Sequence, residues 1–202
     1  SLNLISPGNC RALRMLAGDI IKITNDLKLL NMGPLAGVSE ITLPEVEPGS
    51  SIMPGKVNPS VCEAAHMAAI DVIASDSAIA MAAKAGQLEL NVMTPLILKH
   101  LLGALKLLTK MCSMLNVDCV KGIQVNENTV AGHLEGSLAS ATALAPYLGY
   151  SVVADLVVEA LETKKSIVYV LRRKKFMSEE DLLALLSPER TTKPNILDSK
   201  IK

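Results

Sequence analysis

Aromatic residues are almost missing from this 202-residue sequence, which contains no Trp, one Phe and three Tyr. Apolar residues still make up half of the chain, so its core must consist mainly of Leu, Ala, Ile, Val and Met. Strand-rich folds favour aromatic and β-branched residues, whereas Leu, Ala and Met are good helix formers. The composition therefore predicts an all-α protein whose helices pack on one another.

A net charge is also absent, because twenty Lys and Arg residues balance twenty Asp and Glu residues. Disordered chains combine low hydrophobicity with a high net charge, and nucleic-acid modules usually carry a basic excess. A membrane-spanning helix needs about eighteen apolar residues without a charge, and no window of the sequence provides them. We therefore expect a folded protein that binds neither nucleic acid nor a membrane.

The first residues of the chain lack the charged start and the long apolar stretch of a secretory signal. They also lack an initiator Met, which we take as a sign that the chain is the later part of a longer protein. No two cysteines form a C-x-x-C pair, and all four lie in apolar, helix-like stretches: Cys10, Cys62, Cys112 and Cys119. This pattern favours buried free thiols in a reducing, cytoplasmic setting over a disulfide framework.

Three long helices are predicted within residues 1–120. Apolar residues spaced by three and four form one seam in the segment 11–30: Leu13, Leu16, Ile20, Ile23, Leu27 and Leu30. The segment 60–85 contains ten Ala residues, whose small side chains allow neighbouring helices to approach closely. The segment 93–115 repeats apolar residues at the same helical steps. Helices of this length suggest part of an extended central bundle.

Residues 121–202 predict a small helical C-terminal domain, because shorter helical stretches alternate with Pro and Gly. Ser178 is the predicted N-cap of the last helix, and Asp181 stands at the capping-box position. The final segment, 189–202, is polar, and we expect it to be a mobile tail.

The segment 33–59 has little periodicity and is rich in Pro and Gly, which predicts a long loop. Loops of this length in compact domains are often functional. Its last part combines two Gly, two Ser, Lys56 and Asn58. Gly leaves main-chain N–H groups open to an anion, Lys56 supplies a positive charge, and Asn58 offers a donor and an acceptor. This set suits a dicarboxylate substrate; the alternative is a tight connection between two bundle helices.

No other segment predicts a site of its own. The three histidines are far apart and no His or Cys pair has metal-ligand spacing, so we expect no metal, and we expect His66 and His100 to be structural. No glycine-rich nucleotide fingerprint occurs, and we expect no cofactor. The basic cluster at 164–175 is interpreted as a solvated helical face, with anion binding as the alternative.

The segment 49–59, Gly-Ser-Ser-Ile-Met-Pro-Gly-Lys-Val-Asn-Pro, resembles the signature of the aspartase/fumarase superfamily. The segments 23–41, 85–93 and 121–150 resemble the neighbouring blocks of that family, so the resemblance covers nearly the whole chain. It implies a long-helix central bundle, here residues 1–120, then a small helical C-terminal domain, and assembly as a homotetramer through the bundle.

The resemblance also shows what has no counterpart here: the N-terminal domain, the first bundle helices and two further substrate-site blocks. The chain therefore looks like the C-terminal part, less than half, of such an enzyme. A proteolysis product, an expressed C-terminal piece and a truncated gene product remain alternatives.

The chemistry implied by the resemblance is a reversible elimination that forms fumarate from a succinyl-type substrate. Ser50 matches the base that removes the Cβ proton to give an aci-carboxylate, stabilised by nearby donors. Lys56 and Asn58 match groups that hold the substrate carboxylate. Ser51 is either a second hydroxyl donor or a loop-capping residue.

Three more positions complete the implied site. Gly49 and Gly55 provide the loop backbone whose N–H groups could stabilise an ionised Ser50. Glu63 matches a glutamate that pairs with a histidine of the missing part. Because each active site of the family is built from three subunits, we expect this chain alone to be inactive.

The choice of substrate rests on the segments outside the signature. Residues 85–93 and 192–194 are more similar to aspartases, whereas 47–48 and 188–189 are more similar to fumarases. The segment 85–93 is the longest of these features, so we expect an aspartate ammonia-lyase, with fumarate hydratase as the alternative. A second alternative is a non-catalytic helical-bundle assembly module that binds no substrate.

Overall fold

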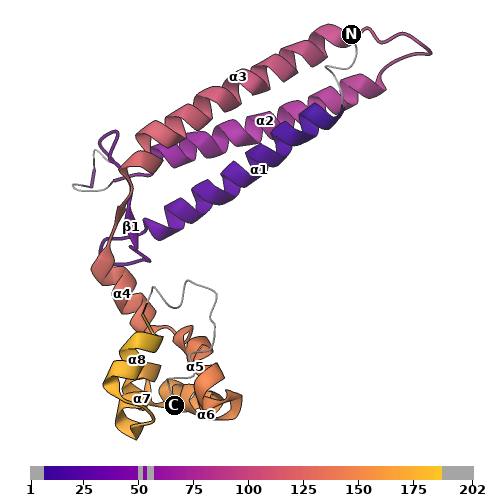
Figure 1. Cartoon of the computed structure of the whole chain (residues 1–202). Helices are drawn as coiled ribbons and strands as arrows, with labels where there is room; N and C mark the ends of the chain where they lie inside the picture. The colour runs from indigo at the N-terminus through magenta and orange to yellow at the C-terminus, as the bar shows by residue number, and fades with distance from the viewer. Residues whose placement is uncertain (1–6, 50–51, 54–56, 188–202) are drawn as a thin grey trace. The chain divides into compact units, whose positions relative to one another are not determined.

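The computed structural model describes residues 7–49, 52–53 and 57–187. These residues hold eight α-helices and two strands of two residues each (Figure 1), which confirms the all-α class expected from the composition. The chain divides into two compact units, Ser1–Asn126 and Glu127–Lys202. The predicted mobile tail, 189–202, lies outside the described residues.

Unit 1 is built on three long helices: α1 (Pro7–Leu30), α2 (Ser60–Lys84) and α3 (Thr94–Asp118). Helix α2 packs along both α1 and α3 (Figure 1). Two of its buried alanines, Ala65 and Ala69, are fully inaccessible, and their small side chains allow the close approach that the Ala-rich sequence predicts. The bounds of all three helices lie within four residues of the predicted ones.

The apolar seam predicted for α1 is only partly right. Ile20 is buried as expected, but Leu16 and Ile23 are 43% and 48% exposed. The core side of the helix instead runs through Ala17 and Thr24, neither of which has accessible surface. The hydroxyl of Thr24 donates to the carbonyl of Ile20 over 2.8 Å, so its burial leaves no unsatisfied polar group.

A short two-stranded sheet closes one end of unit 1. Strand β1 (Ile41–Thr42) pairs antiparallel with β2 (Gln124–Val125). Before β2, the chain passes through the 3₁₀ turn η2 (Val120–Gly122). Gly122 lies so close to Pro44 that an added Cβ would stand 2.4 Å from the proline Cγ. The connection between α1 and α2 is thus held against the segment that follows α3.

Helix α2 satisfies, by length and composition alone, the criteria for a membrane span, which the sequence expectation did not foresee. In unit 1, however, it is packed by both neighbouring helices and buries eight residues. Its exposed side also carries the carboxylates of Glu63 and Asp71. A central helix of a bundle has these same properties, and 28% of the apolar window of α2 is buried within this chain.

Unit 2 contains five shorter helices: α4 (Glu127–Gly136), α5 (Ser140–Leu148), α6 (Tyr150–Thr163), α7 (Ile167–Lys174) and α8 (Glu179–Leu185). Its core is aliphatic and separate from that of unit 1. The largest fully buried side chains are Leu144, Leu156, Ile167, Leu171, Leu185 and Val170.

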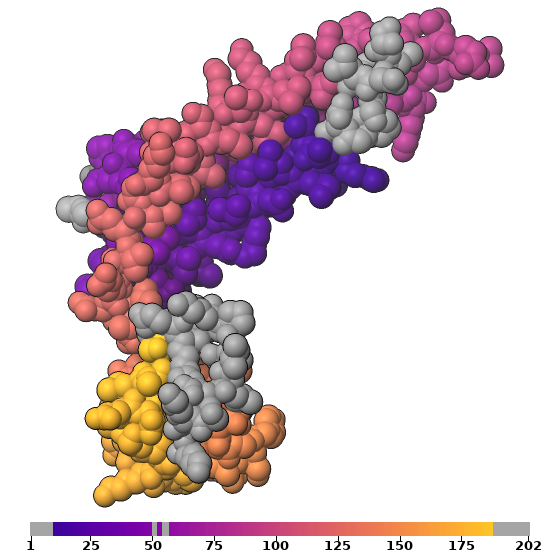
Figure 2. Space-filling model, in the orientation of Figure 1, coloured from indigo at the N-terminus to yellow at the C-terminus, as the bar shows by residue number. Residues whose placement is uncertain are grey.

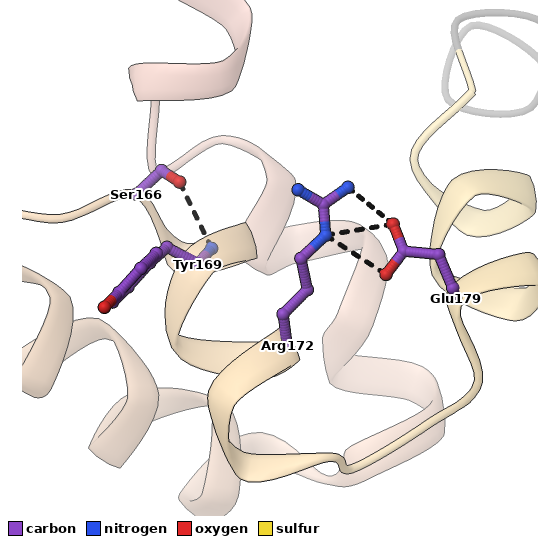
Figure 3. A network of polar contacts seen from close by, with 4 residues as sticks. All are labelled: Ser166, Tyr169, Arg172 and Glu179. Atoms are coloured by element: carbon purple, nitrogen blue, oxygen red, sulfur yellow. Dashed lines mark hydrogen bonds and ion pairs between the residues drawn. The ribbon is translucent and has the colours of Figure 1, made fainter.

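Polar contacts fix the start of α7 and join it to α8 (Figure 3). The hydroxyl of Ser166, the N-cap, accepts from the N–H of Tyr169 over 3.2 Å. The Arg172 guanidinium donates from Nε to both carboxylate oxygens of Glu179, over 2.9 and 3.1 Å. These contacts order the two short helices, which have few turns of their own to stabilise them.

Two further predictions for unit 2 are the N-cap at Ser178 and the basic cluster at 164–175. Ser178 is confirmed as the N-cap of α8, accepting from the N–H of Asp181 over 3.1 Å. In the basic cluster, Arg173 and Lys174 both form ion pairs with Glu159. These pairs lower the pKa of the Glu159 carboxyl, chiefly through the hydrogen bond from Lys174.

Candidate functional site

The signature loop is the segment 49–59. A hydrogen bond joins its first residue, Gly49, to Asn58 near its end. The side-chain Nδ2 of Asn58 donates to the main-chain carbonyl of Gly49 over 2.6 Å. Both residues are half-buried. Four predicted site residues lie outside the described residues: Ser50, Ser51, Gly55 and Lys56. The structure therefore locates the base of the loop at the start of α2, and it places the Asn58 amide there.

The start of α2 is suited to negative charge. Its N-cap is Pro59, and within the described residues no side chain caps the first turn. The first N–H groups of a helix point outward and carry its positive dipole end, which favours anions. Glu63 is exposed in this first turn, and its own N–H bonds the Pro59 carbonyl over 3.0 Å.

Two asparagines outside the signature hold the approach to the loop. Asn31, just after α1, accepts from the N–H of Leu43 over 2.9 Å. Asn126 donates from Nδ2 to the Ser39 carbonyl over 2.8 Å and accepts from the hydroxyl of Thr42 over 3.2 Å. Neither residue is predicted from the sequence, and no local signal identifies Asn126, because its partners are more than eighty residues away.

Comparison with known proteins identifies the scaffold that carries this loop. Residues 9–74 match the family described as Lyase, and residues 141–193 match the family described as Fumarase C C-terminus. An aspartate ammonia-lyase of Pseudomonas aeruginosa is 40% identical over 185 residues, which are 92% of this chain and 39% of that protein. A class II fumarate hydratase of Prochlorococcus marinus is 44% identical over 180 residues, or 89% and 39% of the two chains.

Solved structures agree with these sequence relatives. The cobalt-bound fumarate lyase:delta crystallin of Brucella melitensis superposes with a TM-score of 0.84 at 39% identity, covering 92% of this chain and 40% of that one. The class II fumarase of Schistosoma mansoni gives 0.80 at 36% identity, covering 89% and 37%. This chain belongs to the aspartase/fumarase superfamily. It spans about 40% of the length of the relatives that it matches.

A pair of buried thiols connects the first turn of α2 to the end of α3. The Sγ atoms of Cys62 and Cys119 are 3.7 Å apart, and neither residue is more than 2% exposed. Burial, together with the neighbouring Cys119, raises the pKa of Cys62 to about 12. A thiol with such a pKa is not a nucleophile at neutral pH, so the pair is a packing element that joins α2 to the end of α3.

A second contact joins the start of α2 to the end of α1. Lys28 Nζ lies 3.4 Å from His66 Nδ1. Since an ammonium group only donates, Nδ1 is the acceptor in this contact. Among the described residues, no group of three or more His, Cys, Asp and Glu side chains is arranged to hold a metal ion.

Proposed function

We propose that the protein containing this chain is a fumarate-forming lyase that converts L-aspartate to fumarate and ammonia. The observation that carries the proposal is the closed base of the signature loop: the Asn58–Gly49 hydrogen bond next to the uncapped start of α2. A catalytic loop must keep its reacting groups at fixed positions, and tying its two ends is a direct way to do so. Family membership supplies the chemistry.

In the proposed reaction, the ionised hydroxyl of Ser50 removes a proton from Cβ of the substrate. The electron pair of the broken C–H bond moves onto the adjacent carboxylate, giving the aci-carboxylate. Lys56 and Asn58 hold that carboxylate and oppose its growing charge. When the intermediate collapses, the Cα–N bond breaks and ammonia leaves with its electron pair. Ser51 contributes a further hydroxyl at the same carboxylate.

The positions of Gly49 and Gly55 keep the loop main chain open, so that N–H groups stabilise the ionised Ser50. Glu63 pairs with a histidine supplied by the N-terminal part of the complete protein, outside this chain. The whole site forms in a homotetramer, and no cofactor takes part. The four free thiols suit a reducing, cytoplasmic setting.

Fumarate hydratase is the second candidate, and sequence identity supports it. Curated class II fumarate hydratases reach 42% and 44% identity, while the aspartate ammonia-lyases reach 39–40%. Residues 85–93, which resemble the aspartases, decide our preference. The two enzymes share the aci-carboxylate step and differ only in the leaving group.

The test is a pair of assays on the complete protein that contains these 202 residues. We expect fumarate to form from L-aspartate and not from L-malate, followed by ultraviolet absorbance. Fumarate from malate alone would replace the first candidate by the second. Fumarate from neither substrate, in a tetramer whose intact mass is confirmed, would favour the non-catalytic assembly module instead.

The 202-residue chain by itself is the control for the assays of the complete protein. Because it lacks the other substrate-site blocks, we expect no turnover from a sample with an intact mass near 21.4 kDa. Fumarate formation by that sample would contradict the proposal that the complete site needs the N-terminal part.

A further inference from the structure

A groove between α2 and α3 is lined by lysine side chains that have no role in the proposed lyase reaction. It has a volume of about 530 Å³ and lies beside the middle of α2, away from the loop base at its start. Its charged and polar lining consists of Asp71 and Ser75 from α2, and Lys99, His100, Lys106 and Lys110 from α3. Figure 2 shows that α3 lies on the surface of unit 1.

The charge of this groove is one-sided. All three lysines of α3 line it, and Asp71 is the only carboxylate among its lining residues. In the described part of unit 1, none of these three lysines forms an ion pair with another residue. Lys106 and Lys110 are four residues apart on one helix, an arrangement of like charges that weakens a helix. Stability of α3 alone therefore does not account for this pattern.

The lysines form a row on one face of α3. At about 1.5 Å of rise per residue, Lys106 and Lys110 are about 6 Å apart along the helix axis, and Lys99 is about 10 Å further. Gly103 stands between them on the same face, and a Cβ added there would contact nothing within 4 Å. A glycine inside a helix is costly, and among the described residues no packing contact requires this one. It leaves the middle of the row open.

The α2 side of the groove offers a neutral, ordered polar group. Ser75 is 9% exposed, and its hydroxyl lies 3.3 Å from His100 Nδ1. If that hydroxyl donates to Nδ1, the imidazole keeps its proton on Nε2, where it can donate to a ligand. The groove thus combines three ammonium groups with a fixed imidazole and hydroxyl.

We propose that this groove binds an extended oligophosphate anion, with adjacent phosphates contacting Lys106 and Lys110 and the remaining length of the anion directed toward Lys99. The spacing of the row favours several linked anionic groups over one small ion. Lysine binds phosphate as a mobile point charge without a fixed geometry, which suits a flexible chain of phosphates. This site is independent of the proposed lyase reaction, because none of its residues belongs to the signature loop.

The experiment is isothermal titration calorimetry of the 202-residue chain with inorganic triphosphate at low salt. Lys106→Gln/Lys110→Gln should weaken binding about tenfold, the combined effect expected of two exposed charge pairs. The matched control is Lys84→Gln/Lys121→Gln, which removes the same charge from two exposed lysines outside the groove and should leave the affinity within about twofold. Asp71→Asn should tighten binding, because it removes the one opposing charge.

Two results would overturn the proposal. Equal weakening by the groove variant and the control variant would mean a general electrostatic effect of the surface. A wild-type chain that does not bind triphosphate, while light scattering shows a mass that falls on Lys106→Gln/Lys110→Gln substitution, would mean that a second copy covers this face. Titration with ATP in parallel distinguishes the source: similar affinities indicate recognition of the phosphates alone, and weaker binding of ATP indicates an inorganic oligophosphate.

Discussion

Asn58 donates a hydrogen bond from its side chain to the main-chain carbonyl of Gly49 over 2.6 Å. The bond spans a loop of eight intervening residues, 50–57, and brings its two ends together at the start of α2. Closing the loop in this way limits the conformations that the loop can adopt, which lowers the entropic cost of ordering it around a substrate. Asn58 therefore has a structural role in addition to its proposed contact with the substrate.

Replacing Asn58 by Ala tests the structural role without any substrate. We expect Asn58→Ala to lower the free energy of unfolding by about 1 kcal/mol, the net contribution of one hydrogen bond. Urea denaturation of the 202-residue chain measures this. Asn25→Ala is the matched control, because Asn25 is exposed on α1 and its loss should cost nothing. An Asn58→Ala variant as stable as the unsubstituted chain would show that the Asn58–Gly49 bond is not retained in solution.

Substitutions of the two adjacent serines, Ser50 and Ser51, test which hydroxyl acts as the base. In the complete protein, Ser50→Ala should reduce fumarate formation by at least about a hundredfold, because the proposed base is gone. Ser51→Ala removes a hydroxyl of the same size from the next position and should cost much less. Steady-state assays of both variants decide this. Comparable activities would reject Ser50 as the base.

Two glycines of unit 1 should respond in opposite directions to the same substitution. Gly122→Ala forces a Cβ to within 2.4 Å of Pro44, and we expect a loss of about 1–3 kcal/mol from overpacking. Gly18→Ala lies inside α1, where an added Cβ would have no neighbour from the other described elements within 4 Å, and it should raise stability by up to about 1 kcal/mol, because Ala favours the helix. Thermal unfolding of both variants provides the comparison. A stable Gly122→Ala variant would contradict the close approach of Pro44.

The four free thiols should differ strongly in reactivity. Cys112 is exposed, whereas Cys62 and Cys119 are buried and have raised pKa values. With a pKa of about 12, only on the order of 10⁻⁴ of Cys62 is thiolate at pH 8. Alkylation of the native chain, followed by peptide mass spectrometry, should therefore label Cys112 first and leave Cys62 unlabelled until the chain unfolds. Early labelling of Cys62 would indicate that the end of the bundle opens readily.

The same thiol predicts a loss of stability in alkali. The unfolded thiol ionises near its ordinary pKa of 9.0, while the folded Cys62 ionises at about 12. The stabilisation is complete below pH 9 and is lost as the pH rises toward 12, by about 1.4 kcal/mol for each pH unit at most. Cys62→Ala should show a shallower decline than Cys112→Ala between these values. Parallel curves of stability against pH for the two variants would contradict the assignment.

Local periodicity and the loop motif determined the main outline of this protein. The three long helices, the N-cap at Ser178 and the all-α class follow from side-chain spacing and capping chemistry, which depend on residues within a few positions of each other. The loop motif in residues 49–59 identified the superfamily for a similar reason, since its residues are contiguous in the sequence.

Tertiary structure alone decided which faces and which distant residues meet. Leu16 and Ile23 fit the predicted seam as well as Ile20 does, yet they are exposed, because the position of α2 selects the buried side of α1. Asn126 meets Ser39, and Cys62 meets Cys119, across long separations in the sequence. No local pattern encodes such pairs, because they arise when the helices pack and bring the ends of α1, α2 and α3 together at the base of the loop.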